Sequence, residues 1–443
     1  MKPIGKIIYT IICLGLLIGL FVAQYQRAYL ALTDSRHLKE LIENLKNSSP
    51  RVHGIFIPEI KQYEGLLLKR LQILYLNSDS RTRVAIISAM QFMEQDHVSE
   101  ILMSIGRYEK DTDIAIWAIS ILMKHDIKVA MPIVTDKLNG SWQSDAKRWL
   151  LFWLGRNPGK LTLQKTEEYL ESDDPTLRSG AVWAYTDIAR KDAYPKLIKM
   201  ISDPDDEVKI AIADALSLYG DSTITNDICE LLNDDNSSVR ISALFALSRI
   251  GSKEAVGPII NRLSEALSIS SNEDSLGNVR ADPEKELDEL IYTLGYFGGD
   301  SAFHAIMEAL DDKRTMQFAA DALSEFDDKR AVAPLLGILN RLNNEKIFDS
   351  VEMRIKVKRA VINTLGRIGD QRAVDPIINL LEKGTENEDV KESAILALGR
   401  LGSPKAIPAI KNVLKDSASK SVILYCKDAL KQLGVESNTI PHI

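Results

Sequence analysis

The feature of this sequence that most constrains its fold is a phrase that occurs twice. Residues 365–381 read LGRIGDQRAVDPIINLL, and residues 398–414, which start 33 positions later, read LGRLGSPKAIPAIKNVL. A short unit that recurs along a chain cannot bury its own apolar residues and must stack on copies of itself. The phrase therefore predicts a repeat protein rather than a chain folded around a single globular core.

Less exact copies of the phrase extend upstream, and their apolar stretches end at eleven positions that we call rungs. The rungs are Met90, Ile119, Leu154, Tyr185, Leu216, Leu247, Leu294, Leu323, Leu365, Leu398 and Leu430. Small and apolar residues recur before each rung at helical spacing, and no strand-like alternation of comparable length is present. We therefore predict an all-α solenoid of about eleven two-helix units.

Each unit is predicted to contain two helices joined by a tight turn. The glycine that ends LGRIG suits the left-handed conformation that closes a helix, and Asp370, Ser252 or Ser403 then lies at the N-cap position of the next helix. Pro376 lies within the first helix of its unit, where a proline is expected to bend the helix or restart it. The second helix is rich in alanine, for example at Ala213, which allows neighbouring helices to pack closely.

The phrase LGRIGDQRAVDPIINLLEKG, followed by DVKESAILALGRLG, resembles the HEAT repeat in the short form named after phycobilisome lyases. The resemblance covers about residues 59–435 and is strongest at 177–260 and 365–434. It implies a right-handed superhelix of helix pairs that usually serves as a protein-binding scaffold, and some members are bilin lyases. We therefore expect protein partners, with a bilin-lyase-like enzyme and a structural subunit of a larger membrane complex as alternatives.

An apolar run near the N-terminus predicts a membrane anchor. Residues 7–26 are twenty positions without a charge, and a helix of that length spans a bilayer core of roughly 30 Å. A cleaved signal peptide is the alternative, but a cut after Ala23 would place the large side chain of Phe21 at the −3 position. We therefore predict an uncleaved transmembrane helix at 7–26.

Charges and glycines around this anchor bear on its orientation and pairing. Lys2 and Lys6 predict a cytoplasmic N-terminus and an extracytoplasmic solenoid, periplasmic in a bacterium, while Arg27 leaves the cytoplasmic orientation open. Gly15 and Gly19 form a GxxxG pair that permits a homodimer in the membrane. The anchor thus predicts a single-pass membrane protein.

Composition sets the other segment boundaries. A short amphipathic helix is expected from about 34 to 47, where it can lie on the bilayer or cap the first unit. Two polar insertions, at 264–286 and 341–354, lengthen their units and provide either binding loops or tolerated slack. The predicted segments are a flank at 1–6, the anchor at 7–26, a juxtamembrane segment at 27–58, the solenoid at 59–435 and a tail at 436–443.

The five tryptophans mark a candidate binding region, because all of them fall between residues 117 and 183. Trp149 and Trp153 are one helical turn apart, Arg156 lies nearby and Trp142 precedes them. Tryptophan and arginine are typical anchors of protein interfaces. We therefore name Trp142, Trp149, Trp153 and Arg156 as candidate partner-binding residues, with the filling of a wider gap between helices as the alternative.

Basic residues recur at one aligned position of the units. They are Arg83, Lys147, Arg178, Lys209, Arg240, Lys358 and Lys391. A basic stripe for an anionic ligand is one interpretation, but the resemblance to HEAT arrays implies that this residue pairs with a turn aspartate of the neighbouring unit, such as Asp205. We predict this structural role. The net charge of −7 also argues against nucleic acid as a partner.

Motifs that would indicate chemistry are absent from the sequence. Cys13, Cys229 and Cys426 have no pairing or metal spacing, and the six histidines are scattered. The sequence has no Walker loop, no GxGxxG after a strand and no GxSxG elbow. We expect buried free thiols and neither a cofactor nor a metal. No catalytic residue can be named, and residues that meet only in the fold leave the question of an enzyme open.

Overall fold

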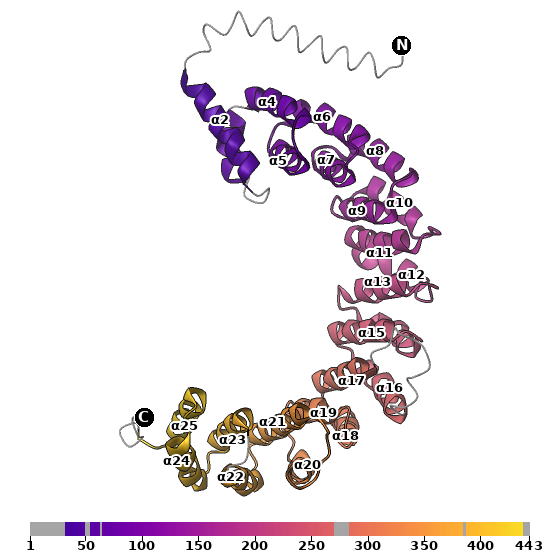
Figure 1. Cartoon of the computed structure of the whole chain (residues 1–443). Coiled ribbons are helices and arrows are strands. Elements are labelled where there is room, and N and C mark those ends of the chain that lie inside the picture. Colours follow the sequence, from indigo (N-terminus) through magenta and orange to yellow (C-terminus); the bar gives the residue numbers. More distant parts are fainter. Residues whose placement is uncertain (1–31, 49–53, 63, 270–282, 384–386, 437–443) are drawn as a thin grey trace, which may run out of the picture. The chain divides into compact units, whose positions relative to one another are not determined.

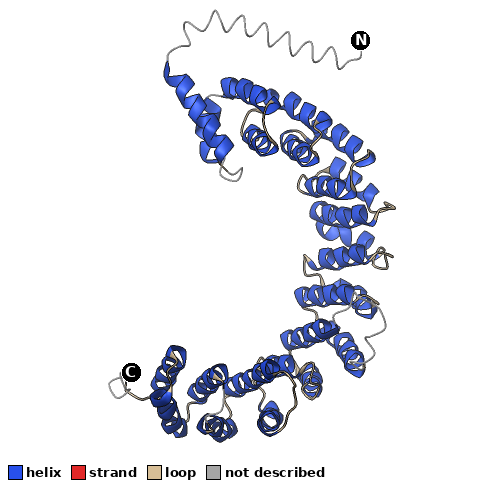
Figure 2. Cartoon of the chain, viewed as in Figure 1, coloured by secondary structure: helices blue, strands red, loops and turns tan. Residues whose placement is uncertain are grey.

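The computed structural model of the chain describes residues 32–48, 54–62, 64–269, 283–383 and 387–436. Every regular element in these stretches is a helix, so the all-α prediction is confirmed for the described part of the chain (Figure 2). The chain separates into two compact units, Met1–Ala189 and Arg190–Ile443, which we call unit 1 and unit 2 and describe separately.

The described part of unit 1 consists of two leading helices and four helix pairs. The leading helices are α2 (Leu32–Asn47) and the short α3 (Ile57–Gln62). The pairs are α4 (Glu64–Leu76) with α5 (Ser80–Met90), α6 (Gln95–Tyr108) with α7 (Thr112–His125), α8 (Ile127–Asn139) with α9 (Ser144–Gly155), and α10 (Lys160–Tyr169) with α11 (Pro175–Ala189). The expected amphipathic helix is α2, which packs against α4 and α5 and so covers the first pair.

Unit 2 continues with seven pairs, and most of its first helices open with a short 3-10 turn. The second helices are α13 (Asp206–Ser217), α15 (Ser237–Ile250), α17 (Pro283–Phe297), α19 (Met316–Leu323), α21 (Val351–Ile368), α23 (Glu388–Leu401) and α25 (Lys420–Gln432). The first helices are α12 (Tyr194–Ile198), α14 (Thr225–Glu230), α16 (Val256–Ser268), α18 (Asp300–Ala309), α20 (Val332–Asn344), α22 (Val374–Glu382) and α24 (Ile407–Asp416). Within each unit, consecutive second helices lie side by side (Figure 1).

The apolar rungs form the core of both units. All eleven rung residues are buried, and each lies on a second helix, at or near its C-terminal end. Consecutive second helices such as α9 and α11, or α21 and α23, pack directly on each other. Each pair therefore buries its apolar stripe against the next pair, as the repeated phrase predicts.

The turns between successive helix pairs have the predicted glycine conformation, but a short 3-10 turn precedes the next helix. Gly251, Gly369 and Gly402 have φ of 72°, 71° and 67°, the left-handed conformation expected at a helix end. Asp370 caps a 3-10 turn at Gln371–Ala373, and α22 starts afresh at Val374. Pro376 is the third residue of α22, where its missing N–H leaves no intrahelical bond unmade, so the helix restarts rather than bends.

Two predicted N-caps and one predicted insertion differ from the structure. Ser252 and Ser403 lie at N-cap positions, but neither side chain makes the capping hydrogen bond. The insertion predicted at 341–354 is mostly helical, because α20 continues to Asn344 and α21 begins at Val351. Most of the inserted residues thus belong to α20 and α21, and only 345–350 lie between the two helices.

Several predictions fall on residues outside the described part of the chain. These are the flank at 1–6, the anchor at 7–26 with Gly15 and Gly19, Cys13, residues 270–282 of the first insertion, and residues 437–443 of the tail. Among the described residues, no helix combines the length and apolar character that a membrane span requires.

Candidate functional site

Aromatic side chains gather on the second helices of unit 1. The rings of Trp117 on α7 and Trp153 on α9 meet edge-on with centroids 6.1 Å apart. Phe152 then contacts Trp153 at 5.6 Å and Trp149 at 5.5 Å, again edge-on. Edge-to-face contacts at these distances are favourable for aromatic pairs. With Trp183 of the neighbouring helix α11, these residues form what we call the tryptophan surface: Trp117, Trp149, Phe152, Trp153 and Trp183.

The rung register explains why these rings reach the exterior. Trp117, Phe152 and Trp183 each lie two positions before a rung. Two residues turn an α-helix by roughly 200°, so these side chains leave the helix on the side opposite the buried rung. Trp149 remains 54% exposed and Trp183 39% exposed. The structure therefore presents large apolar rings to solvent on consecutive second helices.

Basic groups border the tryptophan surface. Lys124 Nζ lies 5.4 Å from the ring centroid of Trp153, and the guanidinium of Arg156 lies 5.2 Å from that of Phe152. Arg156 also reaches Asp187 of α11, with Nε 3.8 Å from a carboxylate oxygen. Cations above aromatic faces are attracted by the ring quadrupole. The surface thus combines apolar rings with cationic margins.

The predicted partner-binding residues are only partly brought together. Trp149, Trp153 and Arg156 meet through Phe152. Trp142 lies in the turn before α9, where its ring instead contacts Lys137 Nζ at 5.0 Å. Trp117 and Lys124 were not predicted at this surface, although the shared register of Trp117 with Phe152 could have indicated the position of Trp117.

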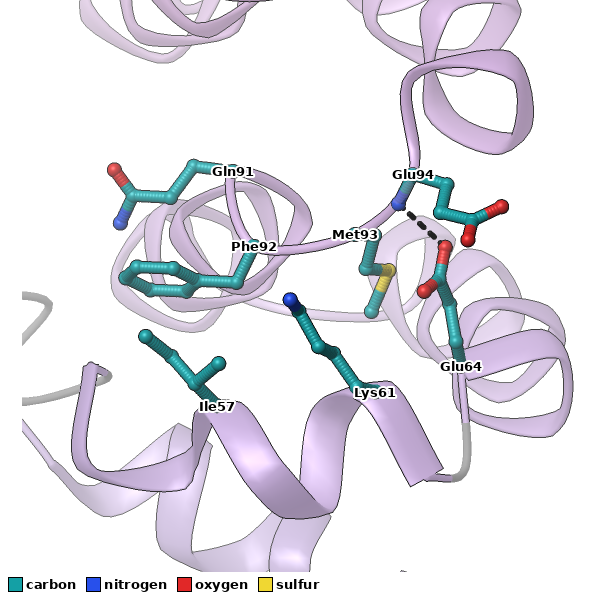
Figure 3. Close-up of a pocket in the computed structure, with 7 residues that line it drawn as sticks. All are labelled: Ile57, Lys61, Glu64, Gln91, Phe92, Met93 and Glu94. Atoms are coloured by element: carbon teal, nitrogen blue, oxygen red, sulfur yellow. Dashed lines mark hydrogen bonds between the residues drawn. The ribbon is translucent and has the colours of Figure 1, made fainter.

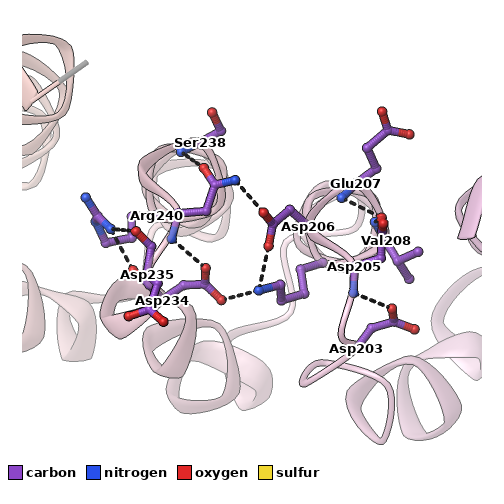
Figure 4. Close-up of polar contacts among 11 residues, drawn as sticks. Asp203, Asp205, Asp206, Glu207, Val208, Asp234, Asp235, Ser238 and Arg240 are labelled. Atoms are coloured by element: carbon purple, nitrogen blue, oxygen red, sulfur yellow. Dashed lines mark hydrogen bonds and ion pairs between the residues drawn. The ribbon is translucent and has the colours of Figure 1, made fainter. Parts of the chain in front are cut away.

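The aligned basic residues are held in a network of turns, most clearly in unit 2. Lys209 Nζ lies 2.5 Å from Asp234 of the next helix pair and 2.9 Å from Asp206 of its own (Figure 4). Asn236 donates from its side-chain amide to Asp206 at 2.5 Å. Arg240 donates to the main-chain carbonyls of Asp234 and Asp235 at 2.6 and 3.0 Å. The contacts of Lys209 and Asn236 fasten neighbouring turns to each other, whereas Arg240 closes the turn that precedes its own helix.

The other aligned basic residues have varied surroundings. Arg83 pairs with Glu109 of the next helix pair at 3.3 Å, and Arg178 donates to the carbonyl of Ser172 at 2.8 Å. Lys358 is buried within α21. Lys147 and Lys391 are half-buried and form no ion pair with the described residues. These side chains therefore do not make a uniform basic stripe.

Comparison with known families decides what kind of repeat this is. The family model of HEAT repeats matches residues 131–216, 163–248, 194–268 and 345–430, which together cover more than half of the chain. The chain belongs to the HEAT-repeat family. The matched residues include the turn network around Lys209 and every ring of the tryptophan surface except Trp117. The resemblance of the repeated phrase to HEAT repeats is confirmed.

Similar proteins support the same family and fold. The chain is 23% identical over 187 residues to a protein of Pseudanabaena tenuis named uncharacterized phycocyanin operon protein Z, a match that covers 41% of this chain and 86% of that protein. A structure of Kap95p binding to RanGDP has a TM-score of 0.63 at 12% identity and covers 90% of this chain. Kap121p bound to RanGTP has a TM-score of 0.57 at 15% identity and covers 83%.

The chain spans only part of those solved structures. It corresponds to 60% of the matched Kap95p chain and 44% of the matched Kap121p chain. At 12% and 15% identity the likeness shows the HEAT solenoid fold alone.

One side-chain cluster among the first HEAT units has the composition of a metal site. Ligand atoms of Glu64, Glu94 and His97 all lie within 4.8 Å of one another. Two carboxylates and an imidazole are ligands that Zn²⁺ accepts. However, Glu64 Oε1 already accepts from the Glu94 N–H at 2.6 Å and contacts His97 Nδ1 at 2.9 Å. The hydrogen bond with Glu64 raises the pKa of His97. These contacts hold the start of α6 against α4.

A hollow of about 430 Å³ lies beside this cluster. Lys61 extends from α3 between Phe92 and Met93, and Glu64 stands at the other side of the hollow (Figure 3). A lysine in the hollow adds a positive charge beside the possible cation site, which disfavours cation binding.

The described cysteines have no reactive character. Cys229 and Cys426 are both buried and free, as predicted. Burial raises the pKa of the Cys229 thiol to about 11 and that of the Cys426 thiol to about 12. Because the thiolate is the reactive form, both side chains act as small apolar groups in the HEAT core.

Proposed function

We propose that this protein is a HEAT-repeat scaffold that is anchored in a membrane through residues 7–26 and binds a partner protein on the tryptophan surface. The observation that carries the proposal is the exposure of Trp149 and Trp183 on adjacent second helices. Large apolar patches on a soluble surface mark interaction sites. Tryptophan is also the side chain most enriched among residues that dominate binding energy.

The margins of the tryptophan surface indicate the chemistry of this partner. Lys124 and Arg156 are held over aromatic rings, so their positive charge lies beside the apolar patch. An aliphatic or aromatic side chain of the partner would cover the rings, and carboxylates at its edge would meet the two cations. Such charge complementarity speeds association and selects the partner.

A pair of matched variants tests the docking proposal. Trp149→Ser combined with Trp183→Ser removes the two exposed rings, whereas Leu161→Ser changes an exposed apolar residue on the first helix α10. The full chain would be purified from its native membranes in mild detergent. We expect a stoichiometric partner to co-purify with wild type and Leu161→Ser and to be lost from the double variant. Equal recovery with all three proteins would contradict the proposal.

The membrane part of the proposal rests on the uncharged run at 7–26. Its length matches the bilayer core, and Lys2 and Lys6 favour an extracytoplasmic solenoid. We expect the full chain to resist alkaline carbonate extraction, whereas a chain starting at Leu32 is released. Protease should then digest the HEAT units when it is added to cells, or to spheroplasts where an outer membrane encloses the solenoid. Extraction of the full chain by carbonate would contradict anchoring, and protection from protease would reverse the orientation.

Handling of an open-chain tetrapyrrole is a second candidate, favoured by the similarity to phycocyanin operon protein Z. The rings of the tryptophan surface could stack on the pigment, while Lys124 and Arg156 could meet its carboxylates. This proposal predicts a stoichiometric absorbance change when the full chain is mixed with a bilin, and loss of that change in Trp149→Ser. An unchanged absorbance spectrum of the bilin would contradict it.

A further inference from the structure

A second exposed aromatic face occurs on the second helices of unit 2. Tyr292 and Tyr296 lie one turn apart on α17 and are 71% and 65% exposed. Phe245 on α15 and Phe318 on α19 are also exposed. Because α17 packs against both α15 and α19, these four side chains occupy three consecutive helices. We call them the tyrosine surface.

A row of four side chains, which we call the central row, runs through the tyrosine surface and contains carboxylates but no cations. The residues two positions before consecutive rungs are Asp214, Phe245, Tyr292 and Asp321, on α13, α15, α17 and α19. Ser242 donates to Asp214 at 3.2 Å, which shows that α13 and α15 keep this register. The row therefore begins and ends with an acid and has two aromatic rings between them.

The acids of the tyrosine surface have no ion-pair partner among the described residues. Asp214, Asp321 and Glu289, the last one turn before Tyr292, form no salt bridge there. Partial burial raises the pKa of Asp214 and Glu289, whereas Asp321 is exposed. An incoming cation would favour the charged form of each carboxylate.

Three cations influence these acids. Arg249, Lys285 and Arg359 lower the pKa of Asp214, Glu289 and Asp321 respectively by longer-range attraction. Arg249 is exposed one helical turn after Phe245 on α15. None of the three forms an ion pair with its acid, so the acids of the central row have no counter-charge among the described residues.

We propose that the tyrosine surface binds an extended segment of a partner protein that carries lysine or arginine side chains about nine residues apart. The row from Asp214 to Asp321 crosses three helix-to-helix steps of roughly 10 Å each. An extended chain advances about 3.3 Å per residue, so about nine residues connect the two acids. Apolar side chains between the two basic residues cover Phe245 and Tyr292.

This surface differs from the tryptophan surface in both place and charge. All of its residues belong to unit 2, whereas the tryptophan surface belongs to unit 1 and has Lys124 and Arg156 at its margin. The proposal therefore does not rest on the function proposed for the tryptophan surface. Failure of one binding site leaves the other intact.

A synthetic probe tests the proposal on the full chain in detergent. The probe is a fluorescein-labelled 14-residue peptide with two lysines nine positions apart and leucine and serine between them. Control peptides replace both lysines by glutamine, or place them four positions apart. We expect the probe to bind by fluorescence anisotropy at least ten-fold more tightly than either control.

Variants locate the binding on the surface. Asp214→Asn with Asp321→Asn should weaken probe binding at least ten-fold, and Tyr292→Ala should weaken it several-fold. Trp149→Ala, in unit 1, should leave it unchanged. Circular dichroism of each variant checks that the helices remain. Absence of probe binding, equal binding of the controls, or loss of binding in Trp149→Ala but not in the asparagine variant would overturn the proposal.

Discussion

Glu286 shows how a single residue can hold a HEAT unit together. It is 2% exposed at the start of α17, where its Oε1 accepts from Arg240 Nε and Arg262 Nε, both at 2.7 Å. Burial raises the pKa of Glu286, but the hydrogen bonds from Arg240 and Arg262 outweigh it, and the pKa lies below its ordinary value of 4.5. Two arginines from different helices thus depend on one carboxylate.

The stability provided by Glu286 should therefore depend on pH. Because its pKa is lower in the folded protein than in the unfolded chain, this contribution is complete above about pH 4.5 and is lost as the pH falls through the folded pKa. At pH 7, Glu286→Gln should lower the free energy of unfolding of unit 2 by about 3 kcal/mol, and it should reduce the acid sensitivity. Urea titrations at pH 7 and pH 4, followed by far-ultraviolet circular dichroism, measure both effects.

A matched variant and a second signal make this prediction specific. Glu265→Gln removes an exposed carboxylate that also contacts Arg262, at 3.2 Å, and should change little. All five tryptophans lie in unit 1, so their fluorescence reports on that unit alone. The tryptophan transition should not move in Glu286→Gln. An unchanged dichroism midpoint in this variant would show that the two arginines do not need the carboxylate.

The contact between Arg240 and Glu286 was not predicted. Arg240 was expected to pair with a turn aspartate of the neighbouring unit, but it donates to the main-chain carbonyls of Asp234 and Asp235 in its own turn. Its carboxylate partner could not be found, because Glu286 is the last residue of the insertion predicted at 264–286 and lies 46 positions away. No repeat spacing relates the two residues.

At the scale of helices, close packing depends on small residues at the contact between second helices. A Cβ added at Gly366 on α21 would lie 2.7 Å from both Cα and Cβ of Ala397 on α23. Gly366→Ala should therefore force the helices apart and lower the free energy of unfolding by about 1–3 kcal/mol. Far-ultraviolet circular dichroism during urea titration gives the value.

Gly337 supplies the control for this substitution. It lies inside α20, and no atom would come within 4 Å of an added Cβ. Gly337→Ala should therefore stabilise the protein by about 0.5–1 kcal/mol, since alanine restricts the unfolded chain and favours the helix. Destabilisation by Gly337→Ala, or no effect of Gly366→Ala, would contradict the packing described for α21 and α23.

The helices themselves differ in how well the sequence predicted them. Second helices were placed by their rungs, since burial of one residue in every repeat leaves a clear apolar pattern. Most first helices of unit 2 begin with short 3-10 turns, such as Lys253–Ala255 and Gln371–Ala373, that periodicity does not reveal. Proline near the start of α16, α20 and α22 was the available signal, and it predicted a restart or a bend without choosing between them.

At the scale of the whole chain, contacts divide the protein between Ala189 and Arg190. The rung interval across this boundary, from Tyr185 to Leu216, is regular, so the repeat pattern does not mark it. Arg190 has a positive φ of 56° at this boundary, but Asp327 inside unit 2 has a positive φ of 51° as well, so this conformation does not mark the boundary by itself. For a residue other than glycine the conformation is unfavourable, and repeat spacing does not predict it.

The two candidate surfaces could also be predicted only in part from the repeat pattern. The clustering of tryptophans was visible in the sequence, and it pointed to Trp149 and Trp153 correctly as neighbours. The tyrosine surface was missed, because its residues are spread over three helix pairs of unit 2 and form one face only when the second helices are aligned. Aligning positions two before each rung would have revealed both surfaces.

Exposed rings on the second helices of unit 1 are proposed to bind a partner protein. Site-specific photocrosslinking in intact native membranes can detect this contact. A photoreactive phenylalanine analogue would replace Trp183 in one protein and Leu161, on the first helix α10, in another. We predict one discrete crosslinked species from position 183, absent from position 161 and lost when Trp149→Ser is added. No crosslink at 183, or the same crosslinks from both positions, would contradict the account.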